Sequence, residues 1–305
     1  MQFVAVLNRE GGTLRTMDMA AFCAEAEAIF ARHGHGLDCR PVPAKAVERT
    51  LRAAATTPGI DAVMAGGGDG TISAAAGIAF ETGTALAVLP AGTMNLFARA
   101  LGVPLELMAA LEAIAGGEPG RVDIATANRR PFVHQFGVGI HARLVRIREG
   151  MSYGSRLGKM LASLRAVGVA AVNPPRFDVE LRAGAEPSRR RVSGIAISNN
   201  PLGERNIHAA QLDGGKLGVY LAAPVSTSEL ARLAMDIFLG SWRDSPLVSE
   251  LEVPEVELHF PRRKKSAQAV IDGELIPLAD SVVLKIHPAG LPVILPAQGM
   301  GDQKS

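Results

Sequence analysis

The sequence predicts an α/β amino-terminal domain with a parallel sheet, followed by a mostly antiparallel β domain. Short apolar runs alternate with helical segments up to about residue 115, as in a parallel sheet covered by helices on both faces. Beyond residues 116–120 this alternation gives way to short strands. A chain of 305 residues, 48% of them apolar, is also long enough for two cores. We expect domains at 1–120 and 121–287, and leave open whether 288–305 return to the first.

The elements of the first domain follow from apolar runs of strand length and helical spacing. Asp18 is placed to cap the first helix, which glycines at 34 and 36 then end. The expected strands are 3–7, 37–42, 60–64 and 85–89, and the later expected helices are 44–55, 72–80, 95–100 and 104–115.

The second domain is expected to contain mainly strands. The runs 122–126 and 132–138 indicate a hairpin, because a polar segment with a proline links them. Helices are expected over 157–172 and 227–238. The other expected strands are 177–181, 192–198, 217–222, 248–253, 256–260, 267–271 and 282–286, with a final apolar run at 292–295.

A glycine-rich stretch, residues 65–71, lies between an expected strand and an expected helix. Glycines at 66, 67, 68 and 70 allow positive φ and close approach to a ligand, and the N–H groups that open a helix attract anions. This pattern favours a phosphate cradle. Asp69 fits beside phosphates only with a cation between them, so the stretch predicts a metal-bound nucleotide.

The stretch alone does not specify a function. It lacks the Gly-Lys-Ser/Thr of a P-loop and the glycine spacing of the dinucleotide fingerprint, and a tight structural turn is an equal alternative. Two more polar glycine loops, residues 8–13 and 90–95, also follow strands. Ligands of parallel sheets bind at the carboxyl ends of strands, so three such loops favour a binding site.

Charge and cysteine content limit the classes of partner. A net charge of +2 gives no reason to expect nucleic acid. Basic runs at 189–191 and 262–265 indicate solvated hairpin ends or a face that touches anionic lipid. Cys23 and Cys39 form neither a disulfide framework nor a metal-ligand spacing, which favours a reducing cytosol.

The amino terminus starts as a strand without a basic leader, and no apolar run approaches the ~18 residues that span a bilayer. Membrane contact is therefore expected to be peripheral.

Three segments together resemble a known family. Residues 8–12, 67–71 and 90–98 are similar to the catalytic domain shared by diacylglycerol kinases, sphingosine kinases and bacterial lipid kinases, and residues 213–217 and 271–274 resemble later motifs of that family. The resemblance covers nearly the whole chain. It implies a phosphofructokinase-like nucleotide domain and a carboxy-terminal antiparallel β-sandwich.

The resemblance implies that ATP and Mg²⁺ bind the first domain, with Asp69 reaching the phosphates through the metal. Asn95, at the start of a helix, is equally open to a structural role. The implied nucleotide-binding residues are Asn8, Gly11, Gly12, Gly67, Gly68, Asp69, Gly70, Thr71, Gly92, Thr93 and Asn95.

The resemblance also places Asp272 or Glu274 beside the acceptor hydroxyl, so the implied catalytic residues are Asp69, Asp272 and Glu274. Taken alone, Asp272-Gly273 is also an ordinary hairpin turn, and the sequence leaves open which carboxylate is the base. Gly214 stands where bacterial members have an aspartate that holds a structural magnesium ion.

The implied function is an ATP-dependent lipid kinase of phospholipid biosynthesis, acting on the hydroxyl of diacylglycerol or a related lipid. We expect it in the cytoplasm, in peripheral contact with an anionic membrane at the inner face. One alternative is an NAD-kinase-like enzyme with a soluble acceptor. Another is a family member that binds nucleotide or lipid with little catalysis, which Gly214 favours. A homodimer is left open.

Overall fold

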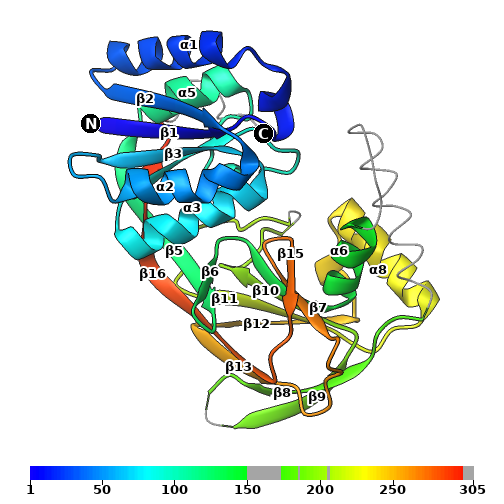
Figure 1. Cartoon of the computed structure of the whole chain (residues 1–305). Helices are drawn as coiled ribbons and strands as arrows, with labels where there is room; N and C mark the ends of the chain where they lie inside the picture. The colour runs from blue at the N-terminus through cyan, green and yellow to red at the C-terminus, as the bar shows by residue number, and fades with distance from the viewer. Residues whose placement is uncertain (150–172, 185, 205–206, 298–305) are drawn as a thin grey trace. The chain divides into compact units, whose positions relative to one another are not determined.

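The structure, a computed structural model, describes residues 1–149, 173–184, 186–204 and 207–297 (Figure 1). The chain forms two compact units. The first unit is Met1–Ile124 together with the segment from Pro288 onward, and the second unit is Ala125–His287.

The first unit contains the parallel sheet that the sequence predicts. Its strands lie in the order β2-β1-β3-β4, and the carboxyl end of β16 pairs in parallel with β4 at Val293 and Leu86. The strands are β1 (Gln2–Asn8), β2 (Gly36–Val42), β3 (Ala62–Gly67), β4 (Ala85–Pro90) and β16 (Ser281–Leu295).

Helices cover both faces of this sheet (Figure 1). Helices α1 and α5 pack on one face, and α2 and α3 pack on the other. All residues of β3 are buried, as expected for a strand covered on both sides. The helices are α1 (Met19–Arg32), α2 (Val47–Ala55), α3 (Asp69–Thr82), α4 (Leu96–Ala100) and α5 (Leu107–Ala115), with 3-10 turns η1 (Gly12–Thr16) and η2 (Ala44–Ala46).

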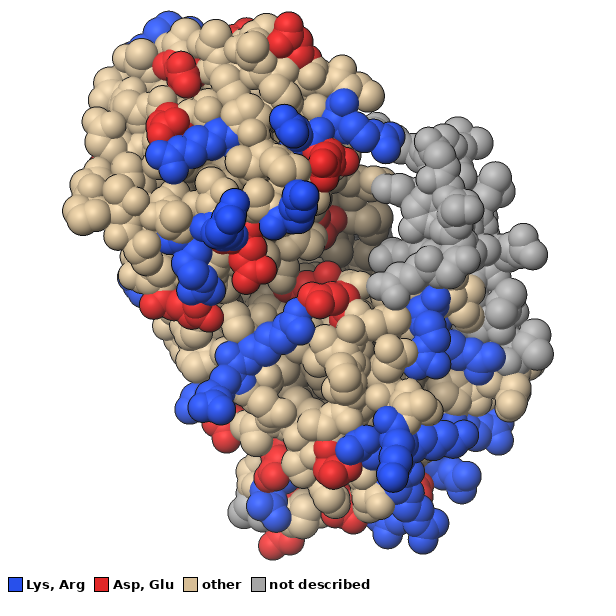
Figure 2. Space-filling model, viewed as in Figure 1, with Lys and Arg blue, Asp and Glu red and all other residues tan. Residues whose placement is uncertain are grey.

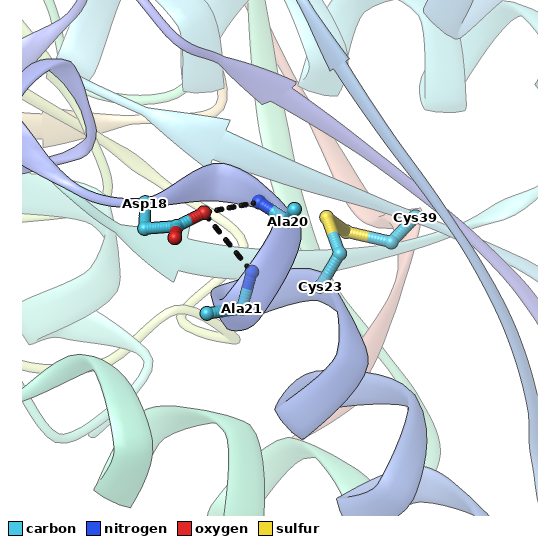
Figure 3. The surroundings of a disulfide bond; sticks show 5 residues. All are labelled: Asp18, Ala20, Ala21, Cys23 and Cys39. Atoms are coloured by element: carbon cyan, nitrogen blue, oxygen red, sulfur yellow. Dashed lines mark hydrogen bonds between the residues drawn. A yellow bond between two sulfur atoms is a disulfide. The ribbon is translucent and has the colours of Figure 1, made fainter.

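The expected cap of α1 is confirmed (Figure 3). The Asp18 carboxylate accepts the N–H groups of Ala20 and Ala21 at 3.0 and 3.2 Å. Helix α5 begins at Leu107, later than expected, because Glu106 caps it by accepting the N–H of Ala109.

The prediction that the two cysteines form no disulfide is wrong. Cys23 in α1 and Cys39 in β2 are joined by a disulfide, with their Cα atoms 5.6 Å apart (Figure 3). They meet because α1 packs against the edge strand β2, a tertiary contact that cysteine spacing does not reveal. The bond removes the cysteine-based argument for a reducing compartment.

The second unit contains two antiparallel layers. One is a six-stranded sheet in the order β12-β11-β10-β7-β14-β15, and the other contains β9, β8, β13 and the amino-terminal part of β16. The strands of the six-stranded sheet are β7 (Gln135–Gly139), β10 (Gly194–Asn199), β11 (Leu217–Ala222), β12 (Val248–Val253), β14 (Gln268–Ile271) and β15 (Glu274–Pro277).

The two layers share one apolar core, the arrangement of a β-sandwich. Phe136 and Val219 of the first layer belong to the same buried cluster as Val179 and Leu258 of the second. The remaining elements are β5 (Glu118–Ala127), β6 (Arg130–Phe132), β8 (Phe177–Arg182), β9 (Pro187–Val192), β13 (Glu255–His259), α6 (Ile140–Glu149), α8 (Thr227–Leu239) and η3 (Trp242–Asp244). The predicted fold class is confirmed.

Several predicted elements differ from the structure. The hairpin partner of β5 is β6, and the expected strand 132–138 divides because β7 joins β10 and β14 in the other sheet. The expected strand 192–198 divides at Ser193 into β9 and β10, whereas 282–286 and 292–295 belong to one strand, β16. Helix α6 was not predicted. The expected helix 157–172 lies outside the described residues.

Among the helices that the structure describes, none has the length and apolar character to cross a bilayer.

We expect the disulfide to stabilise the first unit. Replacing Cys39 with Ser should lower the free energy of unfolding by about 2 to 3 kcal/mol, because a bond between residues 16 apart restricts the unfolded chain. Urea unfolding with and without a thiol reductant measures this. Reductant should shift the midpoint of the native chain toward that of the variant and leave the variant unchanged. Equal midpoints for the native chain in both conditions would contradict the prediction.

Candidate active site

The candidate nucleotide site consists of the loops that follow β1, β3 and β4, whose carboxyl ends share one edge of the sheet. The loop after β1 lies directly against the loop after β4. The N–H of Thr13 donates to the Ala91 carbonyl at 2.9 Å. Gly12 has φ +50°, and a Cβ there would lie 1.7 Å from the same oxygen. Only glycine fits at position 12.

The loops after β3 and β4 are in equally close contact. The N–H of Ala91 donates to the Gly67 carbonyl at 2.9 Å. A Cβ on Gly92 would lie 2.7 Å from the Cα of Gly68. The predicted convergence of three loops is therefore a contact of backbone against backbone.

Positive φ, which the sequence allows at glycines 66, 67, 68 and 70, does not occur at any of them. Strand β3 continues through Gly67, Gly68 is the extended N-cap, and α3 begins at Asp69. Close packing explains the first two glycines, because a Cβ would lie 2.4 Å from Leu7 at position 66 and 2.6 Å from Thr71 at position 67. Gly70 is exposed, and a Cβ there would meet no atom within 4 Å.

Asp69 connects the second loop to the third. Its Oδ2 accepts the N–H of Asn95 at 3.1 Å and its Oδ1 accepts the N–H of Leu96 at 2.7 Å. The carboxylate therefore satisfies donors at the start of α4, where no helical carbonyl is available. Each oxygen has two lone pairs, so these bonds leave acceptor capacity for a cation.

Asn95 has a structural role in the third loop. It is 8% exposed with φ +51°, its Oδ1 accepts the N–H of Gly92 at 2.9 Å, and its Nδ2 donates to the Gly92 carbonyl at 3.2 Å. This turn leaves Thr93 exposed at the loop tip. Of the two roles left open for Asn95, the geometry supports the structural one.

Asn8 likewise shapes its own loop. Its Oδ1 accepts the N–H of Glu10 at 3.1 Å and its carbonyl accepts the N–H of Gly11 at 3.0 Å. A Cβ on Gly11 would lie 3.0 Å from the Asn8 amide nitrogen, so the two residues are in contact.

A cation that the sequence did not lead us to expect lies beside these loops. Arg99 in α4 is exposed and donates from Nε to the Met94 carbonyl at 2.9 Å. It therefore brings a guanidinium to the loop that contains Thr93. Arg99 follows Asn95 by one helical turn, and this spacing in the sequence could have indicated that its side chain lies near the loop.

In the second unit, Asp272 and Gly273 form the two-residue turn between β14 and β15. Their φ values are +46° and +87°, and Ile271 pairs with Glu274, as in a type I′ hairpin. The predicted turn is confirmed. Positive φ at both central residues favours Asp-Gly at this position.

The Asp272 carboxylate holds the segment between β6 and β7. It accepts the N–H groups of Val133, His134 and Gln135 at 3.0, 3.0 and 2.8 Å. Asn199, a buried residue that the sequence analysis did not single out, donates its N–H to the His134 carbonyl at 3.0 Å from the end of β10. Residues 133–135 are thereby fixed by the Asp272 carboxylate and by the backbone N–H of Asn199.

Glu274 is in a different environment. Its side chain is 68% exposed and forms an ion pair with Arg130 at 2.5 Å. The two carboxylates of the turn therefore have different partners. Asp272 accepts backbone N–H groups, whereas Glu274 pairs with an exposed arginine.

Gly214 lies beside a buried amide. A Cβ there would be 3.4 Å from the Asn200 Nδ2. Neighbouring Asp213 is exposed, and the described part of the chain contains no group of three or more His, Cys, Asp or Glu that could hold a metal.

Comparison with known proteins shows a similarity to diacylglycerol kinases. Residues 2–127 match the sequence model of the diacylglycerol kinase catalytic domain. A diacylglycerol kinase of Staphylococcus saprophyticus is 28% identical over 184 residues, which are 57% of this chain and 58% of that protein. An uncharacterized protein of Synechocystis sp. is 25% identical over 246 residues, 77% of this chain and 55% of that protein. The matched regions thus span little more than half the length of these relatives.

The fold is also found in a solved structure. The crystal structure of a diacylglycerol kinase from Bacillus anthracis str. Sterne superposes with a TM-score of 0.70 at 16% identity, over 96% of both chains. At this identity the likeness establishes the fold alone. The domain match over residues 2–127 confirms the resemblance drawn from the three glycine loops: this part of the chain is similar to the catalytic domain of diacylglycerol kinases.

Proposed function

We propose that this protein is an ATP-dependent lipid kinase that phosphorylates the hydroxyl of diacylglycerol or a related lipid at a membrane surface. The observation that carries the proposal is the contact of three glycine loops at the carboxyl ends of β1, β3 and β4. Phosphoryl transfer depends mainly on positioning and charge neutralisation, and fixed backbone loops provide positioning. Similarity to diacylglycerol kinases supports a phosphotransferase.

The residues at these loops fit a nucleotide with magnesium. When bound, Mg²⁺–ATP would supply the phosphoryl group and neutralise charge on its oxygens. Asp69 has acceptor capacity for the cation, Gly70 leaves open space at the start of α3, and Thr71 and Thr93 carry hydroxyl groups nearby. Arg99 adds positive charge at the third loop.

Asp272 and Glu274 are the candidate bases for the acceptor hydroxyl, and each has one advantage. Asp272 is fixed in position by three N–H donors, but these bonds already occupy acceptor sites on its oxygens. Glu274 is exposed and less constrained. A general base must lie within hydrogen-bond reach of the acceptor hydroxyl, and it must have an oxygen available to take the proton. Asp272 and Glu274 differ in these two respects, so each is tested separately.

A second candidate function is binding of nucleotide or lipid with little turnover. The bonding of both Asp69 and Asp272 to backbone N–H groups favours this alternative, because each carboxylate already has a structural role.

Radiolabelled ATP with a mixed lipid extract tests the proposal. We expect label in an organic-soluble product only when Mg²⁺ is present. The same labelling is expected when diacylglycerol is the sole lipid added in place of the extract. NAD and a lipid-free reaction are the controls. Labelling of NAD, or of no acceptor at all, would contradict the lipid kinase and favour a soluble acceptor or a binding protein respectively.

Replacing Asp69 with Asn should weaken Mg²⁺-dependent ATP binding by about tenfold or more, since the carboxylate charge is lost. Asn95→Gly is the matched control, because it loosens the same loop, keeps the carboxylate and tolerates the positive φ. Calorimetry with Mg²⁺ and with EDTA should show that only Asp69→Asn loses the magnesium dependence. The same magnesium dependence in Asp69→Asn and the native chain would remove Asp69 from the metal site.

Replacing Glu274 with Gln should leave stability nearly unchanged, whereas Asp272→Asn should destabilise the fold by about 1 to 3 kcal/mol by turning an NH₂ toward backbone donors. Whichever residue is the base should lose roughly 100-fold or more in turnover without losing ATP affinity. Thermal unfolding, turnover and calorimetry separate the two effects. Arg130→Gln is the control, as it breaks the ion pair and keeps Glu274. Near-normal turnover in both carboxylate variants would leave the turn with a structural role only.

A further inference from the structure

Two basic runs that are far apart in the sequence lie at the same end of one sheet. Strand register places Arg191 opposite Asp178 and Arg190 opposite Val179, near the start of β8. Strand β13 runs antiparallel to β8, so its last residues also approach that end of β8. The rings of Phe260 and Phe177 confirm this, with centroids 6.1 Å apart. The turn at 262–265 therefore starts at the same end of the sheet as Arg190 and Arg191, with β8 between them.

The carboxylates at this end are already paired with other arginines. Asp178 pairs with Arg189 at 3.6 Å, and Asp280 pairs with Arg263. The remaining cations, which we call the basic end, are all exposed, and no carboxylate of the described residues forms an ion pair with them. The basic end comprises Arg190, Arg191, Arg262, Lys264 and Lys265. Figure 2 shows lysine and arginine side chains gathered in the region where Figure 1 labels β8 and β9.

We propose that the basic end is the surface through which this protein docks on anionic lipid headgroups of a membrane. The proposal rests on the proposed lipid kinase function, because the acceptor lipid resides in such a surface. Uncompensated lysine and arginine attract anionic headgroups over about one Debye length, ~10 Å at 0.1 M salt.

The composition of the basic end favours a lipid surface over nucleic acid. Proteins that bind single strands place aromatic side chains among basic ones so that bases can stack on them. Within the described residues, the large exposed apolar side chains are aliphatic or methionine, and none belongs to the basic end. The aromatic rings at this end, Phe177 and Phe260, are partly and fully buried and contact each other. The basic end therefore offers charge without an exposed stacking platform, which suits headgroup phosphates.

The test is vesicle cosedimentation without ATP, so that binding is measured apart from catalysis. The variant replaces all five residues of the basic end with Gln. The control replaces five other exposed cations with Gln and so has the same net charge: Arg32, Lys45, Arg49, Arg182 and Lys285. Arg182 lies at the end of β8 that is farther from the basic end.

We expect the native chain and the control to bind vesicles of phosphatidylglycerol and phosphatidylcholine, more weakly as salt rises, and to bind pure phosphatidylcholine poorly. The variant should lose about tenfold or more of its binding to the anionic vesicles. It should keep its turnover on detergent-dispersed diacylglycerol, if the proposed function holds.

Three results would overturn the docking surface: equal loss in variant and control, equal binding of the native chain to both kinds of vesicle, or binding to single-stranded RNA in preference to anionic vesicles. A different result would contradict the proposed function. Specific vesicle binding without phosphorylation of any lipid would support the docking surface and contradict the kinase.

Discussion

The first unit depends on the close approach of backbone at Gly12, Gly68 and Gly92. A Cβ at Gly12 or Gly92 would overlap a neighbouring loop, with Ala91 oxygen at 1.7 Å and Gly68 Cα at 2.7 Å respectively. Close-packed backbone has few alternative arrangements, because a small shift produces a clash or opens a gap. These glycines therefore do more than permit a turn. They bring three separate strand ends close enough to act as one surface, and the exposed groups of that surface are the ones available to a ligand.

Both units fix a segment by bonding an aspartate to backbone N–H groups. Asp69 holds the start of α4, and Asp272 holds residues 133–135. Each carboxylate is itself fixed in return, and a site that must recognise developing charge benefits from groups that need no reorganisation. A structural role and a catalytic role are therefore compatible in one residue. Loss of activity on substitution is informative only when stability is measured beside it.

Hydrophobic periodicity was sufficient to predict the order of strands and helices in the first unit, and strand ends were sufficient to bring its glycine loops together. Features set by tertiary packing could not be predicted in this way. The Cys23–Cys39 bond depends on α1 lying against β2, and the division into β6 and β7 depends on which sheet each strand joins. The role of Asn95 was undecided for the same reason, since only the folded loop shows that its amide is bonded to Gly92.

The distribution of charge on the surface is also set by tertiary structure, because it depends on strand register more than on composition. A net charge of +2 describes a nearly neutral chain, and two short basic runs are common at hairpin ends. Antiparallel pairing of β8 with both β9 and β13 brings these runs to one end of a sheet. Arg189 and Arg263 then pair with the carboxylates present there, and the remaining cations are left exposed together. A concentrated positive surface can therefore arise in a protein whose overall charge gives no sign of it.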